Sequence, residues 1–217
     1  MTTTTAVDAL LQRVVDQAPL VESVTNAVTI ADVAEVIRQW GALPVMADDV
    51  REIDAMVAAA EAVHLNMGTV DADGEAALCA AAEAAAAHGI PSVFDPVGVG
   101  ATPTRDAVAA AIIETATPTI IKGNHAEISA LAGADAEVRG VEAVGTYTAI
   151  AETAQAYAAA TDTVVVASGE TDVVASAERV VTIAGGDPML GAVVGTGCML
   201  GGTLAAVAAS ASEPMEA

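Results

Sequence analysis

The chain has 217 residues, and its 54% apolar content excludes a disordered polymer, although only 2% of the residues are aromatic. Asp and Glu number 29 against 7 Lys and Arg, which gives a formal net charge of −22 at pH 7. A surface of this charge repels nucleic acid and anionic lipid, so we expect neither nucleic acid nor a membrane as a partner. The carboxylates are spread along the whole sequence, which indicates a halophilic, cytoplasmic protein in a cell whose salt screens their repulsion.

An amphipathic helix is expected at 8–16, and after it short β-branched segments alternate with longer Ala-rich segments. This alternation predicts an α/β fold of βαβ units, in which helices cover both faces of a parallel sheet. The strands are expected at 43–46, 62–66, 92–94, 119–122 and 163–167. The other helices are expected at 32–40, 50–60, 74–88, 105–115, 126–132 and 148–160.

The pattern changes beyond Ser168. Residues 172–175 and 179–183 flank a short polar turn and predict an antiparallel hairpin at the edge of the sheet. A glycine loop and a last helix follow, within a charge-free stretch at 191–212. The Gly, Ala, Thr and Ser content of this stretch favours a buried helix over a transmembrane helix. Because no linker or internal repeat is visible, we expect one domain over residues 1–217.

Ligands of open α/β sheets bind at the carboxyl ends of the strands. Segments rich in glycine or polar residues follow such ends at 95–102, 122–127 and 168–170, and a fourth at 195–198 opens the last helix. Unpaired N–H groups and the helix dipole make a helix start a site for anions. Lys122 is the only lysine in the chain, and it offers a cation for phosphates.

Each of these segments also has a purely structural interpretation. Strand-end glycines form turns, an Asp there caps a helix, and the spacing of Asn124 and Glu127 is that of a capping box. Together, however, the segments supply two carboxylates for Mg²⁺, a cation for phosphates and an anion hole beside the Cys198 thiol. This combination predicts phosphoryl transfer.

At these residues the sequence resembles the ribokinase-like vitamin kinases, and within them the hydroxyethylthiazole kinases, over nearly its entire length. The motifs that carry the resemblance are, in order, Pro19-Leu20-Val21 with Thr25-Asn26-Ala27-Val28, Ala42-Leu43-Pro44-Val45-Met46-Ala47, Asn66-Met67-Gly68-Thr69, residues 95–102, Lys122-Gly123-Asn124 with Glu127, and Gly195-Thr196-Gly197-Cys198-Met199-Leu200. The resemblance implies a ribokinase-like three-layer αβα sandwich with a mostly parallel sheet. It also implies ATP-dependent phosphorylation of the hydroxyl of 4-methyl-5-(2-hydroxyethyl)thiazole, a step of thiamine biosynthesis and salvage.

The resemblance further implies how the two substrates bind. Met46, Asn26 and the backbone at Gly195 would bind the thiazole, and Lys122 and Ser168 would bind ATP. The family is typically a trimer with pockets between neighbouring subunits. By analogy we expect a homotrimer in which the region of Asn26 and Met46 faces the glycine loop of another copy.

The catalytic roles follow from the same resemblance. Asp95 and Glu127 would hold Mg²⁺, largely through water. Cys198 would occupy the position of the base, at a helix start that favours a thiolate. Gly195 and Gly197 would complete the anion hole beside it. A loose phosphoryl transfer needs little base strength. Positioning of the substrates by this loop can therefore matter more for the rate than the thiol itself.

The chain departs from the family pattern at three places. Members usually have His before an Ile-Thr-Asn stretch where this chain has Glu22-Ser23-Val24, and they more often have Arg where Lys122 stands. The family also continues through further helices beyond the position of Ala217. Two alternatives therefore stay open: a hydroxymethylpyrimidine (phosphate) kinase, which shares the glycine–cysteine motif, and a non-catalytic ligand-binding remnant with a short C-terminus. None of the histidines has the spacing of metal ligands, and we expect surface or strand-end positions for His64, His88 and His125.

Overall fold

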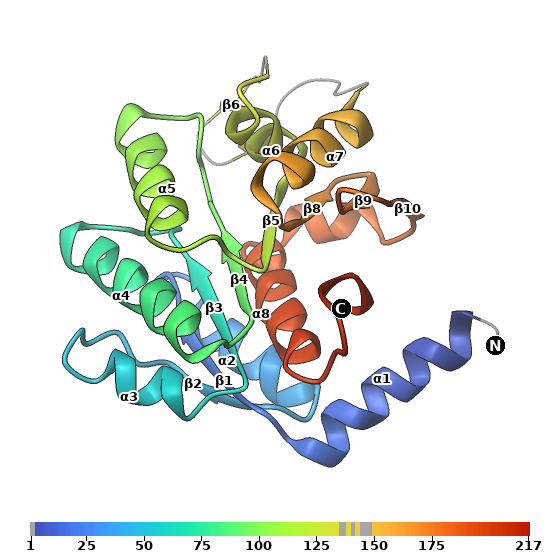
Figure 1. The fold of residues 1–217 in the computed structure, drawn as a ribbon. Coiled ribbons are helices and arrows are strands. Elements are labelled where there is room, and N and C mark those ends of the chain that lie inside the picture. The colour runs from blue at the N-terminus through green and yellow to red at the C-terminus, as the bar shows by residue number, and fades with distance from the viewer. Residues whose placement is uncertain (1–2, 135–137, 140–141, 144–148) are drawn as a thin grey trace.

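The computed structural model describes residues 3–134, 138–139, 142–143 and 149–217. An eight-stranded sheet lies between two layers of helices (Figure 1). Its strands are β1 (Leu20–Val24), β2 (Leu43–Val45), β3 (Ala62–Asn66), β4 (Ser92–Asp95), β5 (Ile120–Asn124), β8 (Val164–Ser168), β9 (Thr171–Ala175) and β10 (Val180–Ala184). A separate two-stranded sheet consists of β6 (Val138–Arg139) and β7 (Glu142–Ala143).

The strand order of the large sheet is β10-β9-β8-β5-β4-β3-β1-β2. Every neighbouring pair from β2 to β8 is parallel, whereas β9 is antiparallel to both β8 and β10. The predicted mostly parallel sheet with an antiparallel edge hairpin is therefore confirmed. The central strand β3 is buried along its whole length, as expected of a strand that helices cover on both faces.

Two helical layers cover the sheet (Figure 1). The helices are α1 (Thr3–Gln17), α2 (Ile30–Gln39), α3 (Ile53–Ala58), α4 (Ala72–His88), α5 (Pro103–Thr115), α6 (His125–Leu131), α7 (Ile150–Thr161) and α8 (Thr196–Ala208), with short 3-10 turns η1 (Pro188–Ala192) and η2 (Pro214–Glu216). On one face α8 packs on β3 and β4 beside α2, and on the other α4 packs on β3 between α3 and α5. The helix α7 covers β8 and β9.

The hydrophobic core divides along these layers. One cluster lies under α3, α4 and α5 and includes Phe94 and Leu65. A second lies under α2 and α8 and includes Val93 and Ile120. Because side chains alternate along a strand, the residues two positions after Val93 and Ile120 also face α8. This alternation determines which polar groups reach the start of α8.

Most predicted elements are confirmed with small shifts at their ends, including the hairpin and the last helix. The helix expected at 50–60 spans only Ile53–Ala58, and turns occupy the residues before it. The helix expected at 148–160 begins at Ile150, while residue 148 lies outside the described residues. Within the described ranges, no helix has both the length and the apolar character that a membrane span requires.

Two sequence-based expectations are corrected. The strand β1 was not predicted, although it lies inside the sheet between β2 and β3, because Glu22 and Ser23 interrupt its apolar run. The expectation of a surface or strand-end position is wrong for His64, which lies mid-strand in β3 with no exposed area. By contrast, His88 ends α4 at the surface and His125 begins α6 directly after β5.

Candidate active site

The polar residues predicted at the strand ends gather beneath the start of α8. Asp95 and Lys122 lie two residues beyond Val93 and Ile120, so their side chains point to the α8 face of the sheet. Asn66 pairs with Asp95 in the parallel register of β3 and β4. These side chains are almost fully buried, which places a polar cluster at the carboxyl ends of three adjacent central strands.

A chain of hydrogen bonds joins the cluster to the glycine loop. Lys122 Nζ lies 3.3 Å from both carboxylate oxygens of Asp95. Asn66 Nδ2 donates to Asp95 Oδ2 at 2.9 Å, and Asn26 Nδ2 lies 2.9 Å from Asn66 Oδ1 and 3.4 Å from Cys198 Sγ. The structure thus links Lys122, Asp95, Asn26 and Cys198, which sequence analysis placed in one site, and it adds Asn66 as the bridge between them.

The buried Lys122–Asp95 pair sets the electrostatics of the site. Burial by itself lowers the pKa of Lys122, but the negative groups of Asp95, Glu127 and Cys198 outweigh it and raise that pKa above its usual value. Burial raises the pKa of Asp95, while the bonds from Lys122 and Asn66 oppose the rise. The negative groups around the buried Lys122 therefore favour its charged form.

Glu127 occupies a capping box at the start of α6, so the structural interpretation of the Asn124–Glu127 spacing is confirmed. Asn124 Oδ1 accepts from Glu127 N at 2.9 Å, and Glu127 Oε2 accepts from Asn124 N at 2.7 Å. The other oxygen accepts from Gly98 N at 2.7 Å. Burial and then repulsion from Asp95 raise the pKa of Glu127 to about 7, against the attraction of Lys122. The carboxylate thus also responds to the charges of the site.

The helix α8 begins with the predicted glycine loop. Gly195 has a φ of +90°, which an L side chain rarely adopts, and a Cβ there would collide with Thr29. The first backbone bond of the helix runs from Met199 N to Gly195 O, and no described side chain caps this end. The N–H groups of residues 196–198 are those that α-helix geometry leaves unpaired, as the predicted anion hole requires.

The remaining predicted site residues are Gly197, Ser168 and Met46. A Cβ at Gly197 would be 3.3 Å from Lys122 Nζ, which brings the lysine to the first turn of α8. Ser168 ends β8 opposite Asn124, and its hydroxyl donates to the carbonyl oxygen of Gly123 at 3.3 Å. Met46 follows β2, is half-buried and packs against the same core cluster as Cys198.

Sequence analysis missed Arg105 as a residue that holds the site loops. Its guanidinium donates to the carbonyl oxygens of Met67 at 3.1 Å and Gly68 at 2.8 Å, and also to that of Val97. These carbonyls lie just beyond β3 and β4, so Arg105 fixes the loops that follow Asn66 and Asp95. The signal in the sequence was the scarcity of basic residues, only 7 in the chain.

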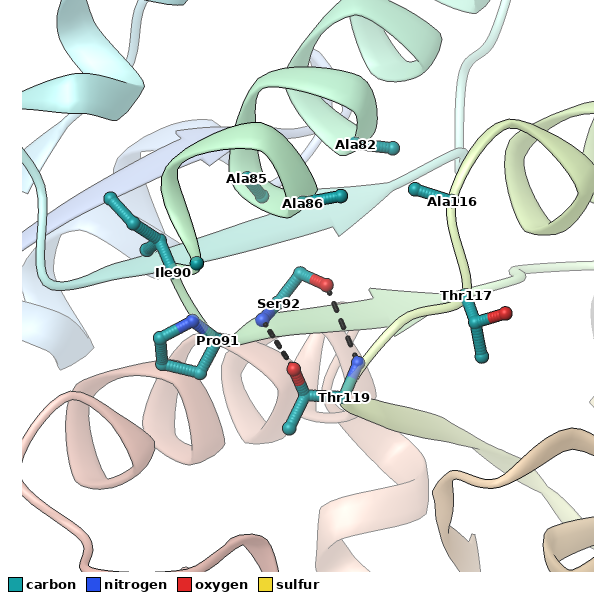
Figure 2. Close-up of a pocket in the computed structure, with 10 residues that line it drawn as sticks. Ala82, Ala85, Ala86, Ile90, Pro91, Ser92, Ala116, Thr117 and Thr119 are labelled. Carbon is teal, nitrogen blue, oxygen red and sulfur yellow. Dashed lines mark hydrogen bonds between the residues drawn. The ribbon is translucent and has the colours of Figure 1, made fainter.

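A cavity of about 360 Å³ lies away from this site. It is lined by three alanines of α4, by residues 89–92 and by Ala116, Thr117 and Thr119, and Ser92 and Thr119 exchange backbone-to-hydroxyl hydrogen bonds there (Figure 2). Ser92 begins β4 and Thr119 precedes β5, so the cavity lies at the amino ends of the strands. The candidate site occupies the opposite edge, where sheets of this kind bind ligands.

The donor set of the site fits a hard divalent cation. Within the described residues, no group of three or more His, Cys, Asp and Glu could hold a metal by itself. Mg²⁺, however, binds proteins through one or two carboxylates and otherwise keeps water and substrate phosphates as ligands. Asp95 and Glu127 supply two buried carboxylates whose pKa values burial raises, and Asp95 raises that of Glu127 further; a cation beside them would favour their ionised forms.

The fold of the chain is the ribokinase-like α/β fold. A solved ribokinase-like superfamily protein from Enterococcus faecalis superposes with a TM-score of 0.64 over 92% of this chain and 73% of its own, at 13% identity. The predicted fold class is therefore confirmed.

The match to one family of that class is more specific. The model of the hydroxyethylthiazole kinase family matches residues 11–217. Hydroxyethylthiazole kinases of Natronomonas pharaonis and Haloquadratum walsbyi are 55% and 52% identical to this chain, over 88% and 99% of it and 69% and 75% of their own lengths. A solved hydroxyethylthiazole kinase protein from Pyrococcus horikoshii OT3 superposes with a TM-score of 0.89 at 33% identity, over 99% of this chain and 80% of that one.

The chain belongs to the hydroxyethylthiazole kinase family, and so to the phosphotransferases of thiamine biosynthesis. The predicted family and enzyme class are confirmed. The relatives from Natronomonas and Haloquadratum are halophilic, in agreement with the composition of this chain.

Proposed function

We propose that residues 1–217 act as one kinase domain that transfers the γ-phosphoryl group of ATP to the hydroxyl of 4-methyl-5-(2-hydroxyethyl)thiazole at the start of α8. The observation that carries this proposal is the position of the only lysine. Its ammonium lies against Gly197, beside the unpaired N–H groups of residues 196–198. A cation and a helix start therefore converge on one point, where they can bind a phosphoryl group.

The chemistry at this point is positioning and charge stabilisation. In a loose phosphoryl transfer the charge spreads over the three equatorial oxygens, so donors aimed at those oxygens lower the barrier. The N–H groups of Thr196, Gly197 and Cys198 would bind these oxygens, and Lys122 would neutralise their charge. Cys198 Sγ would accept the proton of the attacking hydroxyl. Asn26 Nδ2 lies 3.4 Å from that sulfur, and its two hydrogens have closer acceptors in Thr29 Oγ1 at 2.8 Å and Asn66 Oδ1 at 2.9 Å.

The two substrates would bind on either side of the helix start. Met46, Asn26 and the backbone at Gly195 would bind the thiazole, because Asn26 already contacts Cys198 and Thr29 lies against Gly195. Lys122 and Ser168 would bind ATP from the ends of the adjacent strands β5 and β8. Transfer would then run from the β5–β8 side towards the β1–β2 side of the sheet.

Asp95 and Glu127 would hold Mg²⁺ beside the phosphates, largely through water. The ion supplies positive charge that neutralises the phosphate oxygens of ATP. Both carboxylates are buried, and repulsion from Asp95 raises the pKa of Glu127, which supports this role. Asn66 would hold Asp95 in place, since it donates to Oδ2 of that carboxylate at 2.9 Å.

A homotrimer with sites between subunits is part of this proposal. Apolar side chains surround the glycine loop: Val28 and Ile30 flank Thr29, and Val193 and Val194 directly precede Gly195. They are 65%, 38%, 51% and 76% exposed. Exposed apolar surface of this kind is typical of an interface. In a chain of charge −22, it is also a surface on which copies can meet with little repulsion between carboxylates.

The test is a coupled ATPase assay in molar KCl with each candidate alcohol. We expect MgATP turnover with the thiazole alcohol and little with hydroxymethylpyrimidine. Turnover with the pyrimidine alone would favour the pyrimidine kinase alternative. Thiazole or nucleotide binding by calorimetry without turnover on either alcohol would favour the non-catalytic remnant.

A further inference from the structure

A buried histidine lies directly beneath the candidate active site. His64 and Asn66 are two residues apart on β3, so both side chains point towards α8. His64 is fully buried, and its Nδ1 lies 2.9 Å from Ser23 Oγ on the neighbouring strand β1. Its Nε2 has no hydrogen-bond partner among the described residues. The ring is thus fixed from one side and presents its other nitrogen to the helix.

The helix meets this ring at a glycine. A Cβ at Gly201 would lie 2.5 Å from His64 Nε2 and 3.2 Å from Cδ2, so any side chain there would displace the ring or the helix. Gly201 follows Cys198 by three residues, one turn further along the same face of α8. Two successive turns of α8 are therefore connected to β3. Cys198 is linked to Asn66 through Asn26, and Gly201 packs against His64.

The ring is held neutral at this position. Burial and then the positive charge of Lys122 lower the pKa of His64 to about 3. The protonated ring would carry a hydrogen on both nitrogens, and for the one on Nε2, which faces Gly201, no described acceptor lies within reach. A neutral imidazole adds no positive charge next to Lys122, so its contribution is its shape and its bond to Ser23.

We propose that His64 is a positioning residue of this kinase, whose ring fills the space left by Gly201 and thereby fixes the start of α8 relative to Lys122. The inference rests on the proposed transfer of the phosphoryl group at residues 195–198. Displacing a reacting group by about 1 Å can cost a factor of about 100 in rate. His64 and Gly201 set the distance between α8 and β3, so they affect the turnover rate without contacting either substrate.

The test uses two substitutions and their combination, with kcat and KM measured in molar KCl and folding checked by circular dichroism. Gly201→Ala should lower kcat about tenfold or more with little change in the KM of the thiazole. His64→Val, which keeps an apolar residue in the strand, should lower kcat less. The double variant should regain much of the kcat lost in Gly201→Ala, because the smaller side chain makes room for the new methyl group.

Gly202→Ala is the matched control, since a Cβ there would meet Val33 and Ile37 of α2 instead of His64. His64→Val should not rescue it. The proposal is overturned if Gly201→Ala or His64→Val turns over at the parent rate, if the double variant is no better than Gly201→Ala, or if His64→Val rescues both alanine variants equally. Gly197→Val separates the two claims: its full activity would contradict the proposed site itself, whereas its loss with a fully active Gly201→Ala would contradict only the role of His64.

Discussion

Two asparagines connect the proposed catalytic groups of the site. An amide both donates and accepts hydrogen bonds, so Asn26 and Asn66 can join a thiol to a carboxylate without adding charge. Asn26 Oδ1 also accepts from the backbone N–H groups of Val28 at 3.1 Å and Thr29 at 3.0 Å, which fixes the turn after β1. Hydrogen bonds in such a network fix the position of each group, so no flexible charged side chain is needed to hold it.

The carboxylates should control the response to magnesium. Asp95→Ala and Glu127→Ala should each lower turnover and raise the Mg²⁺ concentration needed for half-maximal rate, because each removes a ligand from a site with only two. Titration of the rate with MgCl₂ at fixed ATP measures this shift. Asn124→Ala is the control for the capping box, since it removes the other bond of the box, from Glu127 N to Asn124 Oδ1, while leaving the carboxylate. An equal magnesium shift in Asn124→Ala would contradict a metal role for Glu127.

Glu22 is a buried acid outside the proposed chemistry. Its side chain has no exposed area; Oε1 accepts from Ala47 N at 3.0 Å, and Oε2 has no partner among the described residues. Burial, together with the smaller repulsion from Glu52 and Asp48, raises its pKa from 4.5 to about 7, against the backbone bonds of Ala47 and Ser23. The folded protein therefore retains this proton at a pH where the unfolded chain has lost it.

Glu22→Gln should remove part of the pH dependence of stability. A folded pKa above the unfolded value stabilises the protein below about pH 4.5, and this contribution is lost as pH rises through about 7. The loss for the parent amounts to up to about 3 kcal/mol, and the glutamine variant should not show it. Urea melts of both proteins between pH 4.5 and 8 measure the difference. Curves that stay parallel over this range would refute the assignment of the shift to Glu22.

At the scale of the elements, the alternation of apolar and Ala-rich segments predicted most of the sheet and its helices. It failed at β1, because periodicity cannot recognise a strand whose centre is the polar pair Glu22 and Ser23. Their partners, the Ala47 N–H for Glu22 and the ring of His64 for Ser23, come from distant segments that no local pattern reveals. The same limit explains His64, whose burial depends on Ser23 and on a glycine in α8.

The sequence predicted which residues form the candidate site, but it did not predict the hydrogen bonds that connect them. Strand-end positions and family motifs pointed to Lys122, Asp95 and Cys198, and the structure brings these together. The hydrogen bonds through Asn66 and the three carbonyls held by Arg105 arise only when β3, β4 and α5 pack. Such contacts between distant segments leave no local pattern in the sequence. The only indication for Arg105 was that basic residues are rare in this chain.

Arg105→Lys should loosen the loops after β3 and β4. A lysine keeps the charge but has no planar fork that can reach several carbonyls at once. Turnover and thermal stability should therefore both fall, with a loss of about 1–3 kcal/mol in the free energy of unfolding. Kinetics and melting curves in molar KCl measure the two effects. Arg38→Lys, on the surface of α2, is the matched control, and a loss of equal size there would contradict the clamping role of Arg105.

The net negative charge is the feature of the whole molecule that most affects its folding. The chain carries −22, and its core depends on small Ala and Val side chains with one Phe and one Trp. Unscreened repulsion between carboxylates should therefore compete with folding at low ionic strength, while the Debye length of about 3 Å in molar salt removes most of it. The melting midpoint should rise steeply between dilute buffer and molar KCl. A midpoint independent of KCl would contradict the halophilic interpretation.

The proposed function requires phosphoryl transfer at the start of α8. A single-turnover measurement of MgATP and the thiazole alcohol, with binding measured separately, tests this most directly by comparing the parent with Gly197→Val, Cys198→Ala and Cys198→Asp. Gly197→Val should abolish transfer, because its side chain would fill the space between the helix N–H groups and Lys122.

Cys198→Ala should bind both substrates but transfer about 100-fold more slowly, the low end for general-base assistance, and Cys198→Asp should retain activity. If both Gly197→Val and Cys198→Ala transfer the phosphoryl group at the parent rate, the start of α8 is not the anion hole and the proposed catalytic site is wrong.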